Sequence, residues 1–173
     1  MKFSDIEKLP FSSYNVNIGW KYLPENIQRY KEYYNLNIDP DFQRGYVWTE
    51  DQKIKFLEWG FKGGKSGMQI HFNHPNWMDS FDGELLLIDG KQRLTTVLYF
   101  LDNKIPIFDG NYFKDFEDKM HSMEPNFIFS IFKMKTRKQI LKWYLDMNSG
   151  GSIHTEKDLS LVRKLLKEEE GKN

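Results

Sequence analysis

Five consecutive residues, Asp89-Gly90-Lys91-Gln92-Arg93, place charged and amide side chains between an apolar segment and an amphipathic one. The preceding Leu85–Ile88 has the composition of a buried strand, and the following periodicity predicts a helix over 91–101. Free N–H groups at a helix start favour anions, whereas cations there are unfavourable unless an anion lies between them. The pattern predicts a phosphate-binding turn, with Lys91 as a point charge and Arg93 as a bidentate donor.

A purely structural interpretation of this turn stays open. Asp89 can cap the helix, and Gln92 three residues later can complete a capping-box-like pair. That interpretation leaves Lys91 and Arg93 unexplained. In the functional interpretation, Asp89 holds a magnesium ion that the phosphate carries.

A second Gln-Arg pair, Gln43-Arg44, lies in the aromatic-flanked segment Asp39–Trp48. This segment is predicted to be extended, because Asp39 precedes a proline. Arg44 either stacks on a neighbouring ring or reaches the same anion as Arg93.

The third candidate is the glycine segment Asn148–Ser152. Its consecutive glycines let backbone N–H groups form an anion nest, and an asparagine can hydrogen-bond a base or a ribose. A plain helix-to-helix turn is the alternative.

Hydrophobic periodicity, together with capping and turn residues, predicts the elements that must position these residues. Helices are expected over 24–34, over 52–61 behind a Thr49–Gln52 capping box, from 137 behind a Thr136–Gln139 capping box, and from about 155. Strands are expected over 68–73, 85–88, 104–108 and 126–134. This irregular alternation predicts an α+β fold with a small mixed sheet and a more helical C-terminal part.

Composition excludes several classes of function. Lys+Arg and Asp+Glu both total 25, so the chain has no overall positive charge that would attract nucleic acid. The absence of cysteine excludes thiolate sites and fits a reducing cytoplasm. No apolar run approaches the roughly 20 residues that span a bilayer, and we expect no membrane contact. The GGKS of Gly63–Ser66 lacks the Walker A spacing, and His71 and His74 point to opposite faces of a strand.

Three segments together resemble the motifs of one family. Asp39–Trp48 resembles a PxFQRxYVW-type motif, Ile88–Leu98 resembles a signature written DGQQRLTTL, and Asp146–Leu159 is similar to a later N-x-G-x-x-L element. Their order and spacing also agree. The chain therefore resembles the N-terminal domain of GmrSD-type modification-dependent restriction enzymes, which has relatives in other phage-defence systems, including the SspE type. The resemblance covers Leu36–Leu161.

This resemblance implies a ParB/sulfiredoxin-like fold, nucleotide binding and, in several relatives, nucleotide hydrolysis. The residues that match the motifs are Gln43 and Arg44, then Asp89, Gly90, Gln92 and Arg93, then Asn148 and Gly151. Lys91 stands where the family usually has glutamine, which leaves hydrolysis open. We expect residues 1–35 to form a helical lead-in and residues 36–170 to form the ParB/sulfiredoxin-like domain, in one compact unit. The sequence ends soon after the third motif, and we expect no HNH-type nuclease domain.

The first functional hypothesis is a weak Mg²⁺-dependent NTPase of the bacterial cytoplasm, or of the host cytoplasm if a phage encodes it. Its cofactor is an NTP with Mg²⁺. Asp89, Gln92 and Arg93 are the candidate catalytic residues, and Gln43, Arg44, Gly90, Lys91, Asn148 and Gly151 complete the phosphate site together with Arg93. The alternatives are an inactive regulator or inhibitor of a restriction or defence complex, and a module that binds or nicks DNA. The sequence does not determine the nucleotide or the oligomeric state.

Overall fold

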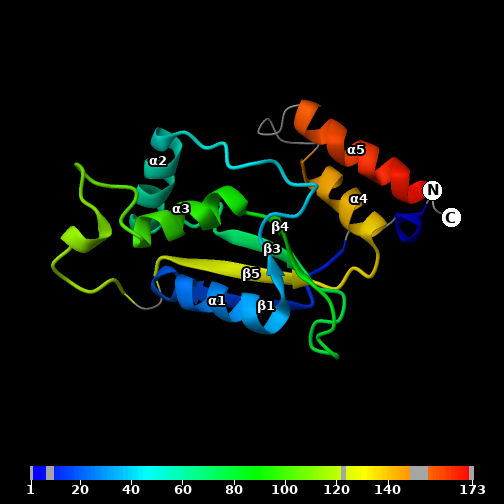
Figure 1. Cartoon of the computed structure of the whole chain (residues 1–173), viewed down its shortest axis with the longest axis horizontal. Helices are drawn as coiled ribbons and strands as arrows, with labels where there is room; N and C mark the ends of the chain where they lie inside the picture. Colours follow the sequence, from blue (N-terminus) through cyan, green and yellow to red (C-terminus); the bar gives the residue numbers. More distant parts are fainter. Residues whose placement is uncertain (1, 7–9, 122–123, 149–155, 172–173) are drawn as a thin grey trace.

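The computed structural model describes residues 2–6, 10–121, 124–148 and 156–171, which form one mixed sheet with helices on both sides (Figure 1). The five strands of this sheet are β1 (Tyr14–Gly19), β2 (Leu36–Asn37), β3 (Gln69–Asn73), β4 (Leu85–Asp89) and β5 (Asn126–Phe132). Their spatial order is β1-β5-β3-β4-β2. The β1–β5 and β3–β4 pairs are antiparallel, and the β3–β5 and β2–β4 pairs are parallel.

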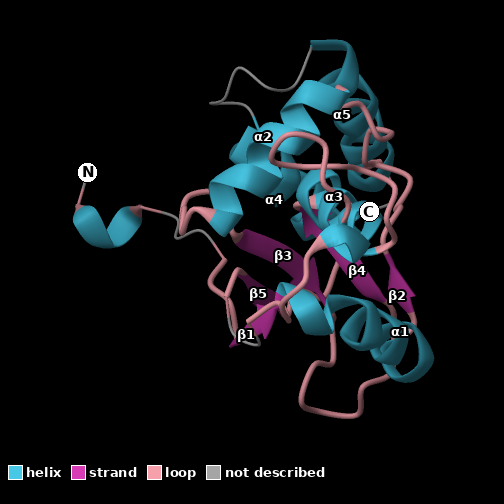
Figure 2. Ribbon diagram, turned by 90° about the vertical axis from the view of Figure 1, so that its left-hand side faces the viewer, coloured by secondary structure: helices cyan, strands magenta, loops and turns pink. Residues whose placement is uncertain are grey.

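Five α-helices surround this sheet: α1 (Leu23–Tyr34), α2 (Glu50–Phe61), α3 (Lys91–Leu101), α4 (Arg137–Asn148) and α5 (Glu156–Glu170). Helix α1 lies on one side of the sheet, and α4 and α5 lie on the other (Figures 1 and 2). The predicted α+β class, with its helical C-terminal part, is confirmed. Among the described residues, no helix is both long and apolar enough to cross a membrane.

The larger core lies between α1, α2, α3 and one face of the sheet. Alternate strand residues such as Phe72, Leu87 and Phe129 are fully buried there, and α1 adds Ile27 and Tyr30 from one helical face. Ring pairs such as Phe72–Phe129, with centroids 4.8 Å apart, account for the high aromatic content. The aromatic residues of this core therefore build structure rather than a binding platform.

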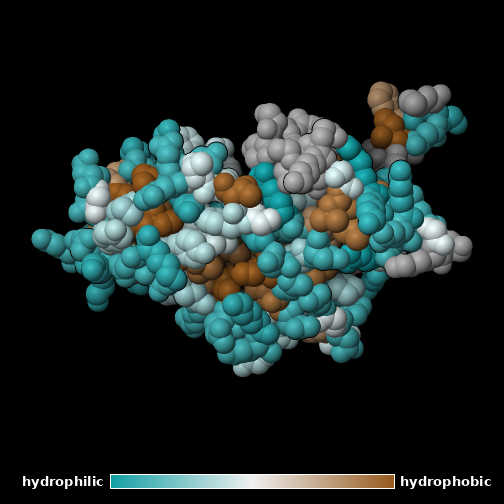
Figure 3. Space-filling model, turned by 45° about the horizontal axis from the view of Figure 1, so that its top comes forward, coloured by the Kyte–Doolittle hydropathy of each residue, from teal (hydrophilic) through white to brown (hydrophobic). Residues whose placement is uncertain are grey.

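A smaller core lies under α4 and α5. Leu141 and Tyr144 of α4 pack there with Phe42, Ile88 and Phe132. Because Ile88 is the last residue but one of β4 and Phe42 belongs to the first motif segment, this cluster fixes α4 beside the turn that follows β4. On the face of the molecule that Figure 3 shows, apolar patches are separated by hydrophilic side chains.

Both predicted capping boxes are confirmed. The Thr49 N–H donates to Gln52 Oε1 over 2.9 Å, and the Gln52 N–H donates back to Thr49 Oγ1 over 3.3 Å. The same reciprocal pair joins Thr136 and Gln139, with both distances 3.2 Å. Local capping chemistry thus sets the starts of α2 and α4.

The strand predicted over 104–108 is wrong. Only an isolated bridge between Ile107 and Asn111 forms there, closed by Phe108 and Asp109 with positive φ. Pro106 has no N–H to donate to a ladder, which keeps this segment out of the sheet. Conversely, the expected lead-in over residues 1–35 contains the edge strand β1 as well as α1.

Candidate functional site

The turn between β4 and α3 is built around Gly90. Its φ of 103° is left-handed, and it occupies the N-cap position of α3 without a side-chain cap. The interpretation in which Asp89 caps the helix is therefore wrong. The first N–H groups of α3 have no acceptor within the helix.

Gly90 also lies against the core. A Cβ at this position would overlap Cδ1 of Ile70 and come within 3.2 Å of its Cγ2, and Ile70 is fully buried. Glycine is thus required at this turn for two separate reasons, backbone conformation and space.

The Gly90→Ala variant should lose about 2 kcal/mol more unfolding free energy than Gly110→Ala. Gly110 has a similar φ of 97°, but no described atom would lie within 4 Å of its Cβ. The pair therefore separates the clash from the backbone strain, and urea unfolding measures both. Equal losses in the two variants would mean that Ile70 moves aside freely.

Arg93 joins three parts of the site. Its Nη2 lies 2.6 Å from Oδ2 of Asp89, and its Nη1 donates to the Gly67 carbonyl over 2.6 Å. The side chain is 18% exposed, so the guanidinium faces the pocket while its position is fixed. A fixed guanidinium loses little freedom when it binds an anion.

His71 of β3 adjoins this ion pair, and its importance was not predicted from the sequence. Its Nδ1 lies 3.9 Å from Oδ2 of Asp89, and its ring packs on Phe132 and Trp143. Burial lowers the pKa of His71, the Asp89 carboxylate opposes that effect, and Arg93 adds to it. The only available signal was the cross-strand register, which pairs His71 with Asp89.

His74 lies elsewhere, in a buried pocket between the rings of Trp77 and Phe81. Burial is the main cause that lowers its pKa. His71 and His74 therefore occupy two separate environments. Among the described residues, no group of three metal-ligating side chains is found.

Gln92 and Lys91 hold the first motif segment over the turn. The Gln92 Oε1 accepts from the N–H groups of Val47 and Trp48 over 2.9 and 3.1 Å, and its Nε2 donates to the Gly45 carbonyl over 3.0 Å. Both polar ends of the Gln92 amide are therefore engaged with backbone.

The Lys91 ammonium binds the Asp39 carboxylate and the Arg44 carbonyl, the latter over 3.1 Å. Its side chain is only 12% exposed. Lys91 therefore fixes the start of the same segment, and it lines the pocket with its charge offset by Asp39.

The segment brings Gln43 and Arg44 to the turn. The Gln43 amide donates to the Leu87 carbonyl of β4, and both residues line the same pocket as Arg93. Tyr46 anchors the segment further along, since its hydroxyl lies 2.8 Å from Oγ1 of Thr96 on α3. The second Gln-Arg pair thus lines the same pocket as the first.

Gln43, Arg44 and the turn residues Asp89–Arg93 line one pocket of about 470 Å³. The end of α4 completes it with Tyr144, Met147 and Asn148. Asn148 donates its side-chain amide to the Tyr144 carbonyl over 2.7 Å. Gly151, the other residue predicted from this segment, lies outside the described residues.

Two rings on the pocket wall were not predicted as site residues. Trp48 and Phe56 both line it, with ring centroids 5.4 Å apart and planes at 63°. Trp48 ends the first motif segment, four residues after Arg44, and its position in an aromatic-flanked segment was the available signal.

Fold and site define an α+β protein with a cation-lined pocket at a strand–glycine–helix turn. A family model described as the N-terminal domain of the GmrSD restriction endonuclease matches residues 25–169. The chain belongs to this family, which confirms the family predicted from its motifs and links it to restriction and phage-defence proteins. No curated protein and no solved structure matches it.

Proposed function

We propose that the pocket at the start of α3 binds the phosphates of a nucleoside triphosphate. The observation that carries this proposal is that three motif segments, distant in the sequence, line one pocket at an uncapped helix start. Gln43 and Arg44, Asp89–Arg93 and Asn148 all lie on its wall. Such a helix start supplies N–H donors and a positive dipole end to an anion.

The charges of the described lining support a polyanion. Arg44, Lys91 and Arg93 line the pocket with one carboxylate, Asp89, and Lys91 also pairs with Asp39, which lies outside the lining. A volume of about 470 Å³ is within the usual range for small-molecule sites. Trp48 and Phe56 offer ring surface on the wall for a base.

Asp89 fits the way in which Mg²⁺ accompanies nucleotides. This ion keeps several waters and takes one or two carboxylates together with phosphate oxygens, rather than a cage of protein ligands. A single carboxylate at the phosphate end of the pocket fits that mode. The ion would neutralise phosphate charge, and Asp89 would fix it relative to Arg93.

Hydrolysis is the activity that we propose for this site. Water would attack the γ-phosphorus, the bond to the bridging oxygen would break, and phosphate and a nucleoside diphosphate would leave. Arg44 and Arg93 would stabilise the charge on the transferring group, and Gln92 would keep the first motif segment in place through its backbone contacts.

The test is thermal unfolding with Mg²⁺ and each of the four common NTPs in turn. At 100 times Kd, a bound nucleotide adds about 2.7 kcal/mol, which corresponds to a Tm increase of about 5–10 °C for a chain of this size. Excess EDTA should remove part of the increase. No increase with any NTP up to millimolar concentration would overturn the proposal.

Phosphate release under the same conditions separates the enzyme from the inactive regulator. A Tm increase with steady phosphate release supports the NTPase. A Tm increase without release above the no-enzyme control would leave nucleotide binding in place and assign the chain to regulation.

A further inference from the structure

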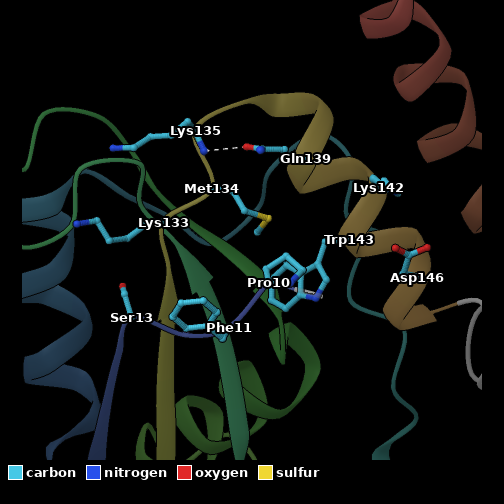
Figure 4. A pocket seen from close by; sticks show the side chains of 10 residues that line it. All are labelled: Pro10, Phe11, Ser13, Lys133, Met134, Lys135, Gln139, Lys142, Trp143 and Asp146. Atoms are coloured by element: carbon cyan, nitrogen blue, oxygen red, sulfur yellow. Dashed lines mark hydrogen bonds between the residues drawn. The ribbon is translucent and has the colours of Figure 1, made fainter. Parts of the chain in front are cut away.

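A second pocket lies on the other flank of α4. Gln139, Lys142, Trp143 and Asp146 line it, at the spacing of one helical face. Its volume is about 640 Å³, larger than that of the pocket at the start of α3. The rest of its wall comes from the end of β5 and from the chain just before β1 (Figure 4).

The interior of this second pocket is apolar. Phe11, Pro10 and Trp143 lie together on one side, and the Met134 side chain points toward them (Figure 4). The Phe11 ring is 86% exposed, although it stands on the wall of a cavity. An exposed aromatic ring beside an apolar cavity is a surface that a ligand can cover.

The rim of the pocket is basic. Lys133, Lys135 and Lys142 line it with a single carboxylate, Asp146, among the described residues. This is a local excess, because the whole chain has equal numbers of acidic and basic residues. A ligand that fits the rim carries negative charge.

Neighbouring groups outside the pocket contact two of these lysines. Lys133 pairs with Asp79 over 2.7 Å. The Lys135 ammonium binds the Pro75 carbonyl and, over 3.0 Å, Oδ1 of Asn76, both of them uncharged acceptors. These two contacts bring no carboxylate to the Lys135 ammonium.

The chemistry of the wall favours a peptide over a nucleic acid strand. Successive bases stack on several exposed rings. Here Trp143 is only 5% exposed, packed on Phe132 with centroids 4.2 Å apart, so Phe11 is the exposed ring of the lining. The rim also offers lysines rather than the arginine forks that suit phosphate geometry.

We propose that this pocket binds an acidic peptide segment of a partner protein, with one aromatic or large aliphatic side chain in the apolar interior. The lysines contact carboxylates that flank this anchor, and Phe11 closes over it. The site is separate from the nucleotide pocket and does not depend on the function proposed for it.

The test is fluorescence polarisation with labelled seven-residue peptides of Asp and Glu with one central Phe, Trp or Leu, without nucleotide. Wild type should bind at least one of them. Phe11→Ala and Lys142→Glu should each weaken binding about tenfold. Lys31→Glu, an exposed change on α1, should leave Kd within about twofold.

Phe11→Ala removes an exposed side chain, so folding is not at issue, and circular dichroism verifies this for each variant. No binding of any peptide at millimolar concentration, or equal binding by wild type and both pocket variants, would overturn the proposal. So would tight, salt-sensitive binding of a thymidine 12-mer in competition with the peptides, which would assign the pocket to single-stranded nucleic acid.

Discussion

Arg93→Ala is expected to weaken the binding of Mg²⁺–NTP by at least about 30-fold, which corresponds to about 2 kcal/mol. The guanidinium is held in place, since Asp89 and the Gly67 carbonyl each bind it over 2.6 Å. Its loss removes a charge from the phosphate site and leaves Asp89 without its nearest counter-charge. Both effects disfavour a polyanion. Isothermal titration calorimetry with the nucleotide that gives the largest Tm increase measures this change.

Two further variants serve as comparisons for this result. Arg93→Lys keeps the positive charge but not the planar pair of N–H donors, and should bind the nucleotide with an intermediate Kd. Arg29→Ala removes an exposed arginine from α1, outside the pocket, and should bind as wild type does. Wild-type affinity in Arg93→Ala would remove this residue from the phosphate site, even if the protein still binds nucleotide.

Gln92→Leu is expected to lower the free energy of unfolding by about 3 kcal/mol. Leucine has a similar volume, but it leaves the N–H groups of Val47 and Trp48 and the Gly45 carbonyl without their partner. Each unsatisfied backbone group costs about 1–3 kcal/mol where water does not replace the bond. Urea unfolding measures the total.

Hydrogen exchange locates the effect. In Gln92→Leu, the amides of Val47 and Trp48 should exchange faster than in wild type, whereas those of β5 should change only by the global loss of stability. The matched control is Gln28→Leu on α1, whose side chain is exposed and bonds only Glu32, and which should cost at most about 0.5 kcal/mol. A Gln92→Leu variant as stable as this control would mean that Gln92 is free to act on a ligand.

Residue patterns predicted the elements around the site because those elements depend on local chemistry. A capping box at Thr49 acts over three residues, and the apolar run of β4 acts over four. The convergence of Arg44 and Arg93 was also predictable, because both follow a glutamine in segments with the same expected anion. Shared chemistry at distant positions is a usable signal.

The different roles of the neighbouring residues Gln92 and Arg93 could not be predicted in this way. Gln92 and Arg93 are adjacent and both polar, yet Gln92 turns to backbone at 45–48 and Arg93 turns to the pocket. That difference depends on where a segment some 45 residues away comes to lie, which is a tertiary property. His71 was missed for the same reason, because only strand register brings it to Asp89.

The position of β1 has a consequence for the order in which the protein can fold during synthesis. Ser13, just before β1, bonds to Ile131 at the end of β5, a separation of 118 residues. At 5–20 residues per second, that interval lasts about 6–24 s. Until β5 emerges from the ribosome, β1 and β3 both lack the strand that lies between them. Such long-range pairing slows folding, so the chain depends on late-made residues for the strand between β1 and β3 and, through α4, for part of the wall of its pocket.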